Sequence, residues 1–169
     1  CVNTLGGLTV DQLRHIFSSK DMADLIADGW DSSSLANVDS DNDREWSDLS
    51  ADCANSAIVL AYPDAESGTF EYFCEAIMND DCSFGTGTQS ADDNVLVNAI
   101  TGDSGSIGFF GFAYFKANQD TLSAIGVADD HSLGISDTTA AAVVPDSVTV
   151  RDGSYSPLSR FLYMNVNND

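Results

Sequence analysis

The alternation of hydrophobic and polar residues predicts helices and strands that follow one another along the chain. In LTVDQLRHIF, residues 8–17, apolar side chains recur with the spacing of one helical face. Thr9 and Gln12 form the Thr-x-x-Gln pattern of a capping box at the start of this helix. The apolar run SAIVLAY, residues 56–62, is typical of a buried strand. We expect the buried face of the helix to consist of Val10, Leu13, Ile16 and Phe17.

A second amphipathic helix is predicted directly after this strand, in the stretch YPDAESGTFEYFCEAI, residues 62–77. Pro63 and Asp64 favour a turn, so they separate the strand from the helix. Apolar residues then recur at helical spacing. The predicted buried stripe consists of Phe70, Phe73, Ile77 and Met78.

The middle of the chain predicts a third helix and a strand. Ser90, with Asp93 three residues later, marks a helix start, and the buried positions are expected to be Val95, Leu96, Ala99 and Ile100. A strand should follow, in which Gly108 and Gly111 indicate close approach of two backbones. The aromatic run in this region is interpreted mainly as core strand, and it consists of Phe109, Phe110, Phe112, Tyr114 and Phe115.

The last third predicts shorter elements: a helix near 117–123, a strand near 124–127, and irregular chain over 128–146. A strand, a turn at Asp152 and Gly153, and a final apolar strand end the sequence. Because strands alternate with helices, we expect an α/β fold with a mixed sheet flanked by helices. The 169 residues suffice for one domain with a sizeable core.

One long segment departs from this alternation. Residues 18–52 are rich in Asp, Ser and Asn, and they predict a long surface excursion with one helical turn at DMADLIADG. Trp30 and Trp46 are the expected anchors of this segment in the core.

The net charge of the sequence excludes two classes of binding partner. Asp and Glu number 27 against 6 Lys and Arg, which gives a formal net charge of −21. Binding of nucleic acid or of an anionic membrane surface requires clustered Lys and Arg, so neither partner is expected. No apolar run reaches the roughly 18 residues that span a bilayer. We expect any targeting segment to lie outside this sequence.

The cysteines are Cys1, Cys53, Cys74 and Cys82. None forms a Cys-x-x-Cys pair and both histidines are distant in sequence, so no zinc site is expected. An even number fits two disulfides in an oxidising compartment. Of the three pairings we favour Cys74 with Cys82, across the end of a helix, which leaves Cys1 with Cys53. Free buried thiols and a lipidated Cys1 are the alternatives.

The Ser67-Gly68-Thr69 step lies where the second helix should begin. A helix start presents unpaired N–H groups and partial positive charge, glycine allows close approach, and two hydroxyls can donate. These groups together form a neutral anion cradle that needs no lysine or arginine. The alternative is an ordinary helix cap by Ser or Thr.

Three motifs, ESGTFEYFCEAI, SADDNVLVNAI and GSIGFFGFAYF, follow one another in an order and spacing that resembles the PstS/SphX-like phosphate-binding proteins of ABC transporters. LTVDQLRHIF, REWSDL and DGSYSPLSRFLYMNV are also similar to that family, whereas residues 18–45 look like an insertion. The resemblance implies a periplasmic-binding-protein-like fold, in which two α/β lobes close around phosphate. Backbone N–H groups, hydroxyls, an arginine and an acceptor carboxylate hold the anion. The Ser-Gly-Thr of that site corresponds to Ser67, Gly68 and Thr69.

The sequence departs from the family pattern in three ways. We expect residues 1–169 to be a single lobe that matches the family's second lobe, so the first lobe and its donors lie outside this sequence. The family arginine falls at Pro63 or, in SphX-like members, at Phe84, and neither residue is basic. Glu66 adjoins the cradle and opposes an anion unless it faces away. Loss of the arginine should cost roughly 1.5–3 kcal/mol of binding free energy.

Two groups of acidic residues could suggest a calcium site or a catalytic site, but simpler interpretations fit them better. Asp39, Asp41 and Asp43 alternate as in a calcium loop, but Arg44 and Ser50 replace the Gly and Glu that an EF-hand requires, so a solvated acidic loop is the simpler interpretation. Capping explains the adjacent carboxylates at 92 and 93 better than catalysis does.

No nucleophile motif lies near His15 or His131, and Gly-x-Ser-x-Gly is absent. We therefore expect no enzyme, no catalytic residue, no metal and no cofactor. The favoured function is an extracellular or periplasmic solute-binding module for phosphate or a similar oxyanion. The alternative is a structural or interaction module of a larger extracellular assembly, in which the fold is kept and the ligand site has decayed.

Overall fold

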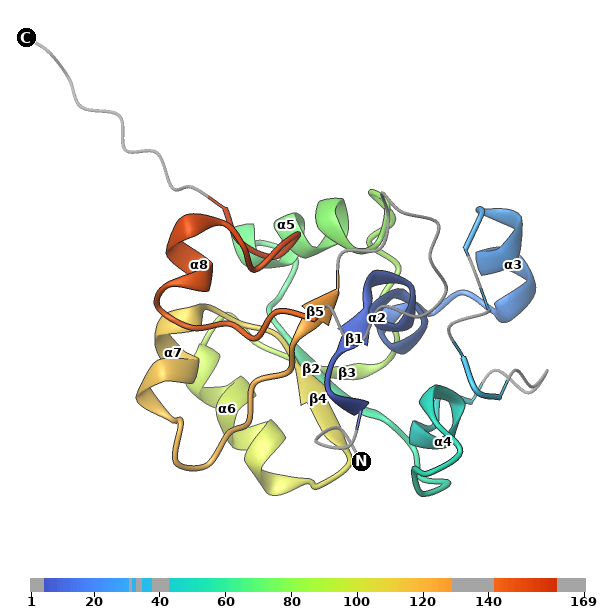
Figure 1. Ribbon diagram of the computed structural model, residues 1–169, viewed down its shortest axis with the longest axis horizontal. Coiled ribbons are helices and arrows are strands. Elements are labelled where there is room, and N and C mark those ends of the chain that lie inside the picture. Colours follow the sequence, from blue (N-terminus) through green and yellow to red (C-terminus); the bar gives the residue numbers. More distant parts are fainter. Residues whose placement is uncertain (1–4, 31, 33–34, 38–42, 129–141, 161–169) are drawn as a thin grey trace, which may run out of the picture.

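The computed structural model describes residues 5–30, 32, 35–37, 43–128 and 142–160. Helices and strands alternate along this chain and surround a small central sheet (Figure 1). None of the described helices has the length and apolar content required to cross a bilayer. The elements are β1 (Leu8–Thr9), α2 (Val10–Phe17), α3 (Met22–Ala27), α4 (Trp46–Leu49), β2 (Val59–Tyr62), α5 (Gly68–Ala76), β3 (Gly87–Gln89), α6 (Asp93–Gly102), β4 (Ser106–Gly108), α7 (Phe112–Ala117), β5 (Val127–Ala128) and α8 (Thr149–Asp152).

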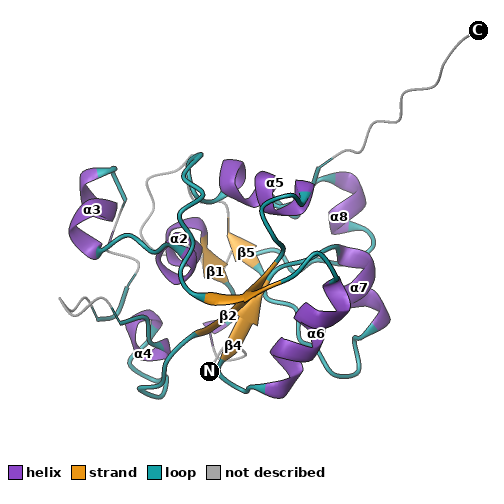
Figure 2. Ribbon diagram, turned by 180° about the vertical axis from the view of Figure 1, so that it is seen from behind, coloured by secondary structure: helices purple, strands orange, loops and turns teal. Residues whose placement is uncertain are grey.

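The main sheet has three parallel strands in the order β3-β2-β4 (Figure 2). Helix α5 connects β2 to β3, and α6 returns the chain across the sheet to β4 on the other side of β2. A separate parallel pair joins β1 to β5. Antiparallel contacts between described residues occur only as isolated bridges, such as the one between Ser18 and Phe84. The α/β fold expected from the sequence is confirmed, whereas the sheets of the described residues are parallel and not mixed.

Helix α2 begins as its sequence predicts. The Thr9 hydroxyl accepts from the N–H of Gln12, and the Gln12 side chain accepts from the N–H of Thr9, so both orphan donors are satisfied. The four expected apolar residues are all buried. The Arg14 guanidinium donates to the carbonyl of Ile77 at 2.8 Å and thereby ties α2 to the end of α5.

An aromatic cluster fills the space between α2, α5 and one face of the sheet. Leu60 and Tyr62 point into this core, since side chains on a strand alternate between its two faces. Phe17 of α2 meets Phe73 of α5 edge-on, with ring centroids 4.9 Å apart. The predicted stripe of α5 is buried as expected, including Ile77 and Met78.

Helix α6 covers the opposite face of the sheet. Its Ile100 lies against Gly108, where a side chain would also collide with the Ala61 carbonyl, so the close approach expected at Gly108 is confirmed. The expected burial of Val95 is wrong: it is 44% exposed, because α6 turns Leu96 and Val97 inward instead. The cap also differs from the prediction. Asp92, not Ser90, is the N-cap, and its carboxylate accepts from the N–H of Asn94.

The acidic segment that precedes β2 carries two short helices, α3 and α4. Trp30 and Trp46 are each 3% exposed, and their indole N–H groups donate to the carbonyls of Asp11 and Gly105. Both tryptophans are therefore the anchors that the sequence predicts. The alternating carboxylates at 39 and 41 lie outside the described residues.

Three predictions from the second half are wrong. The helix expected near 117–123 is absent, because α7 ends at Ala117 and a turn follows it. The aromatic run does not continue β4, because α7 begins at Phe112 and buries none of its residues fully. The strand expected before Gly153 is the short helix α8, because the Asp146 carboxylate accepts from the N–H groups of Val148 and Thr149 and starts a helical turn. Gly153 ends that turn with a φ of 82°. The expected final strand extends into residues that are not described.

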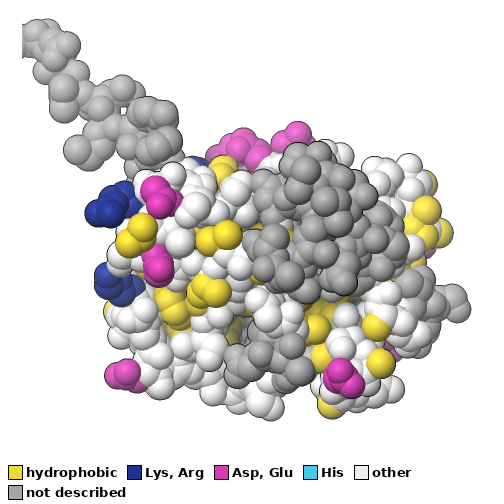
Figure 3. Space-filling model, in the orientation of Figure 1, with side chains coloured by type: hydrophobic (Ala, Val, Ile, Leu, Met, Phe, Trp, Pro, Cys, Tyr) yellow, Lys and Arg dark blue, Asp and Glu magenta, His cyan; other side chains and the backbone are white. Residues whose placement is uncertain are grey.

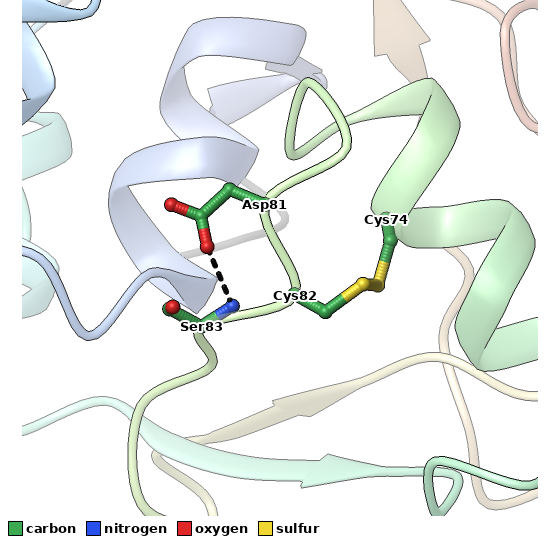
Figure 4. The surroundings of a disulfide bond; sticks show 4 residues. All are labelled: Cys74, Asp81, Cys82 and Ser83. Atoms are coloured by element: carbon green, nitrogen blue, oxygen red, sulfur yellow. Dashed lines mark hydrogen bonds between the residues drawn. A yellow bond between two sulfur atoms is a disulfide. The ribbon is translucent and has the colours of Figure 1, made fainter.

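A disulfide closes the end of α5, as the sequence predicts. Cys74 on the helix bonds Cys82 in the following loop, with Cα atoms 5.2 Å apart (Figure 4). The loop is also held by Asp81, whose carboxylate accepts from the N–H of Ser83. Cys53 is disulfide-bonded as well, whereas Cys1 lies outside the described residues, so their pairing stays a prediction.

Candidate functional site

The Ser-Gly-Thr step lies at the carboxyl end of the central strand. Strand β2 ends at Tyr62, and after a short turn Ser67 is the N-cap of the nine-residue helix α5. Strand β2 lies between β3, reached through α5, and β4, reached through α6. Parallel sheets of this kind bind ligands outside the carboxyl ends of strands at such a reversal of strand order. The topology therefore brings the predicted residues to the position where a ligand site is expected.

The cradle has donors available. The Ser67 hydroxyl accepts from the N–H of Thr69 at 3.2 Å, so it caps the helix and keeps its own proton free to donate. Within the described residues, the N–H groups of Gly68 and Phe70 donate to no acceptor. Gly68 is exposed, whereas Ser67 and Thr69 are half-buried. Capping and anion binding are therefore compatible here, because the cap uses only one of the donors.

The Glu66 side chain is exposed, and the Glu66 backbone N–H donates to the carboxylate of Asp64 at 3.2 Å. The carbonyl of Asp64 accepts from the N–H of Ser67. These two bonds fix the turn that leads from β2 into α5.

Sequence reasoning missed a basic side chain at this site. The guanidinium of Arg160 lies beside Gly68, where a methyl group would come within 3.3 Å of its Nη2 atom. It also lies over the ring of Tyr72, 5.0 Å from the centroid. Residues 68 and 160 are far apart in the sequence, and no local pattern indicates that they meet. The ends of α5 and α8 do lie side by side in both ribbon views (Figures 1 and 2).

The positions that carry arginine in the resembling family belong to the core of this protein. Pro63 is fully buried, and the ring of Phe84 lies 4.7 Å from that of Phe70. Phe84 also packs against Phe17 and Tyr62. Apolar packing therefore explains why neither position is basic.

An apolar pocket of about 450 Å³ adjoins the cradle. Thr69 and Tyr72 form part of its wall, and most of the remaining wall is aromatic or aliphatic, including Phe109 and Leu158. Burial raises the pKa of the Tyr72 hydroxyl, although Arg160 opposes this shift. Its lining also includes hydroxyl side chains, such as Ser104 and Ser106, and Thr69 belongs both to this pocket and to the helix start.

The other candidate groups have structural roles. Asp92 caps α6, and Asp93 accepts from the N–H of Gly111 at 3.4 Å, while burial raises the pKa of the Asp93 carboxyl. His15 is 1% exposed, and its Nε2 atom lies 3.1 Å from the Asp48 carboxylate. Within the described part of the chain, no group of three or more His, Cys, Asp and Glu could hold a metal ion.

On the face seen in Figure 3, basic side chains lie on the side of α7 and α8, and acidic side chains lie beside them as well as elsewhere on this face.

Comparison with known proteins agrees with this architecture. The family described as a PBP superfamily domain matches residues 1–169. The protein SphX of Synechococcus elongatus is 36% identical over 121 residues, which cover 72% of this chain and 34% of SphX. The phosphate-binding protein PstS of Staphylococcus saprophyticus is 29% identical over 160 residues, which cover 95% of this chain and 40% of PstS.

A crystal structure of a possible phosphate binding protein from Planctomyces limnophilus is similar in fold, with a TM-score of 0.67 and 28% identity. The match covers 92% of this chain and 46% of that one, so the chain spans less than half the length of each of these relatives. The family match covers the whole chain, and the solved structure is similar to it in fold. The chain therefore belongs to the PBP superfamily and resembles its PstS/SphX-like members.

Proposed function

We propose that this chain is a solute-binding module for phosphate or a similar oxyanion, and that it catalyses no reaction. The observation that carries this proposal is the exposed start of α5, where Ser67 and Thr69 add hydroxyls to free backbone N–H groups. Such a site binds an anion through dipoles at contact distance. Distant carboxylates are screened over about 8 Å at physiological ionic strength, so the net charge does not prevent binding.

We further propose that residues 1–169 are one lobe of a two-lobed binding protein, with residues 18–45 as an insertion. SphX and PstS are about two to three times longer than the matched part, which supports this division. A second lobe would supply the remaining donors and the acceptor carboxylate. An extracellular or periplasmic location is supported by the Cys74–Cys82 disulfide, because such bonds persist in oxidising compartments.

Phosphate titration followed by amide NMR tests this proposal on the 169-residue chain and on a longer parent that includes the other lobe. We expect shifts at the amides of residues 67–72 in the chain, with weak affinity, and tighter binding by the parent. Chloride at matched ionic strength is the control. If neither protein responds to millimolar phosphate, the proposal is wrong, and a structural or interaction module with a decayed site becomes the better interpretation.

A further inference from the structure

We infer that Arg160 supplies the positive charge of the anion site at the start of α5, in place of the arginine that the resembling family carries elsewhere. This inference rests on the proposed function. Its basis is the position of the guanidinium, whose Nη2 atom occupies the space beside Gly68. A glycine at this position leaves room for the guanidinium and lets a ligand approach the backbone closely.

Tyr72 holds the segment that carries Arg160. The Tyr72 hydroxyl lies 2.5 Å from the carbonyl oxygen of Pro157 and 3.0 Å from that of Ser159, so its proton is shared between these acceptors. The ring of Tyr72 supports the guanidinium through a cation–π contact at 5.0 Å. Tyr72 lies one turn after Gly68 on α5, so a single helix positions both the anion donors and the cation. Tyr72 is therefore a positioning residue for Arg160.

Arg160 has no carboxylate partner within the described ranges, which end at residue 160, although the chain has 27 acidic side chains. Two of the other cations are engaged: Arg14 donates to the carbonyl of Ile77, and Lys20 pairs with Asp28 and Asp81.

A cation beside a helix N-terminus is electrostatically unfavourable, because that end carries partial positive charge. An anion placed between them would be attracted both by the guanidinium and by the partial positive charge of the helix start. The geometry also suits an oxyanion in particular. A guanidinium presents parallel N–H donors that match two oxygens of a phosphate, and the helix start can donate to the others.

The test is phosphate binding by Arg160→Gln and Arg160→Lys, measured by calorimetry or amide NMR at low and physiological salt. Arg160→Gln should weaken binding roughly three- to tenfold, a range that allows for the exposure of the side chain, and should reduce the salt dependence of the dissociation constant. Arg160→Lys should restore part of the affinity, because charge is kept while the paired donors are lost. Arg151→Gln is the matched control, since Arg151 is an exposed cation on the nearby helix α8.

A structural role of Arg160 is separated from a binding role by thermal unfolding without phosphate, where Arg160→Gln should unfold within a few degrees of the wild type. Equal phosphate affinity in wild type and Arg160→Gln overturns the inference and leaves the proposed function standing. An equal loss in Arg160→Gln and Arg151→Gln also overturns it, because a general charge effect then suffices. Absence of phosphate binding by the wild-type chain and by its longer parent overturns both the inference and the proposed function.

Discussion

The ring of Phe73 lies parallel to the ring of Phe109, with centroids 3.9 Å apart and 5° between the planes. Phe73 belongs to α5, and Phe109 directly follows β4, so this stack joins the helix of the site to the neighbouring strand. Phe17 contacts both rings edge-on. Core packing therefore fixes the position of α5. We expect substitutions at its exposed start to change binding without unfolding the protein.

Gly68→Ala should separate binding from stability. The added methyl group would come within 3.3 Å of Arg160, so phosphate affinity should fall. The free energy of unfolding should stay level or rise by up to about 1 kcal/mol, because alanine is the better helix former. Gly102→Ala on α6 is the matched control, since a methyl group there meets nothing within 4 Å. Calorimetry and urea unfolding measure both quantities, and wild-type affinity in Gly68→Ala would contradict the expectation.

Ser67→Ala should affect both quantities. It removes the acceptor for the N–H of Thr69, which should cost about 1 kcal/mol of unfolding free energy, and it removes a hydroxyl donor to phosphate. Thr9→Ala removes a neutral hydroxyl cap from α2 and is the control. Both variants should be destabilised in urea, but only Ser67→Ala should lose phosphate affinity. A similar loss of affinity in both variants would show that capping alone accounts for it.

His15 should make stability depend on pH. Burial and the nearby Arg44 lower the pKa of His15 to about 4, although the Asp48 carboxylate opposes this shift. In the unfolded chain the pKa is about 6.5. Between these values the unfolded state binds a proton that the folded state does not, so the free energy of unfolding falls as pH falls from about 6.5 to 4. Above this window the contribution is fully present.

The expected loss is on the order of 2–3 kcal/mol, measured by urea unfolding at pH 7 and pH 4.5. His15→Gln should lose markedly less over the same interval, whatever its stability at pH 7. Because other carboxylates titrate in both proteins, the difference between the two pH dependences isolates the histidine. Parallel curves would exclude His15 as the source.

The Cys74–Cys82 disulfide should survive alkylation under non-reducing conditions. Its loop is short, because Cys82 follows Cys74 at a sequence separation of 8, so the disulfide should contribute about 2–3 kcal/mol of stability. Peptide mapping after alkylation should recover the linked pair, and the Cys74→Ala, Cys82→Ser double variant should unfold at lower urea. Four alkylated cysteines in the unreduced chain would contradict both predicted bridges. The same map tests the predicted Cys1–Cys53 pairing.

Local patterns predicted the parts of the fold that local forces determine. The capping box at Thr9 and the buried stripe of α5 depend on residues within a few positions of one another. The aromatic run around Phe112 was predicted wrongly because continuous apolar residues fit a strand and a helix equally well. At α8 the β-branched residues favour a strand, but the Asp146 side chain starts a helix there.

The candidate site could be predicted only in part, because some of its contacts join residues that are distant in the sequence. Ser67, Gly68 and Thr69 are consecutive, so their chemistry can be recognised from sequence. Arg160 reaches Gly68 only because the chain folds back along α5 and Tyr72 holds it there. Contacts of this kind depend on the tertiary structure and leave no pattern in a single sequence.

The arginines of the interior have a consequence for the whole molecule. Arg14 and Arg44 donate to the backbone carbonyls of Ile77, His15 and Lys20, so much of the scarce positive charge holds the chain together from within. Compensation of the many carboxylates is then left largely to dissolved cations. The screening length falls from about 30 Å at 0.01 M salt to about 3 Å at 1 M, so dissolved salt weakens the repulsion between the carboxylates of the folded protein. We expect the folded state to be more stable at high ionic strength than at low ionic strength.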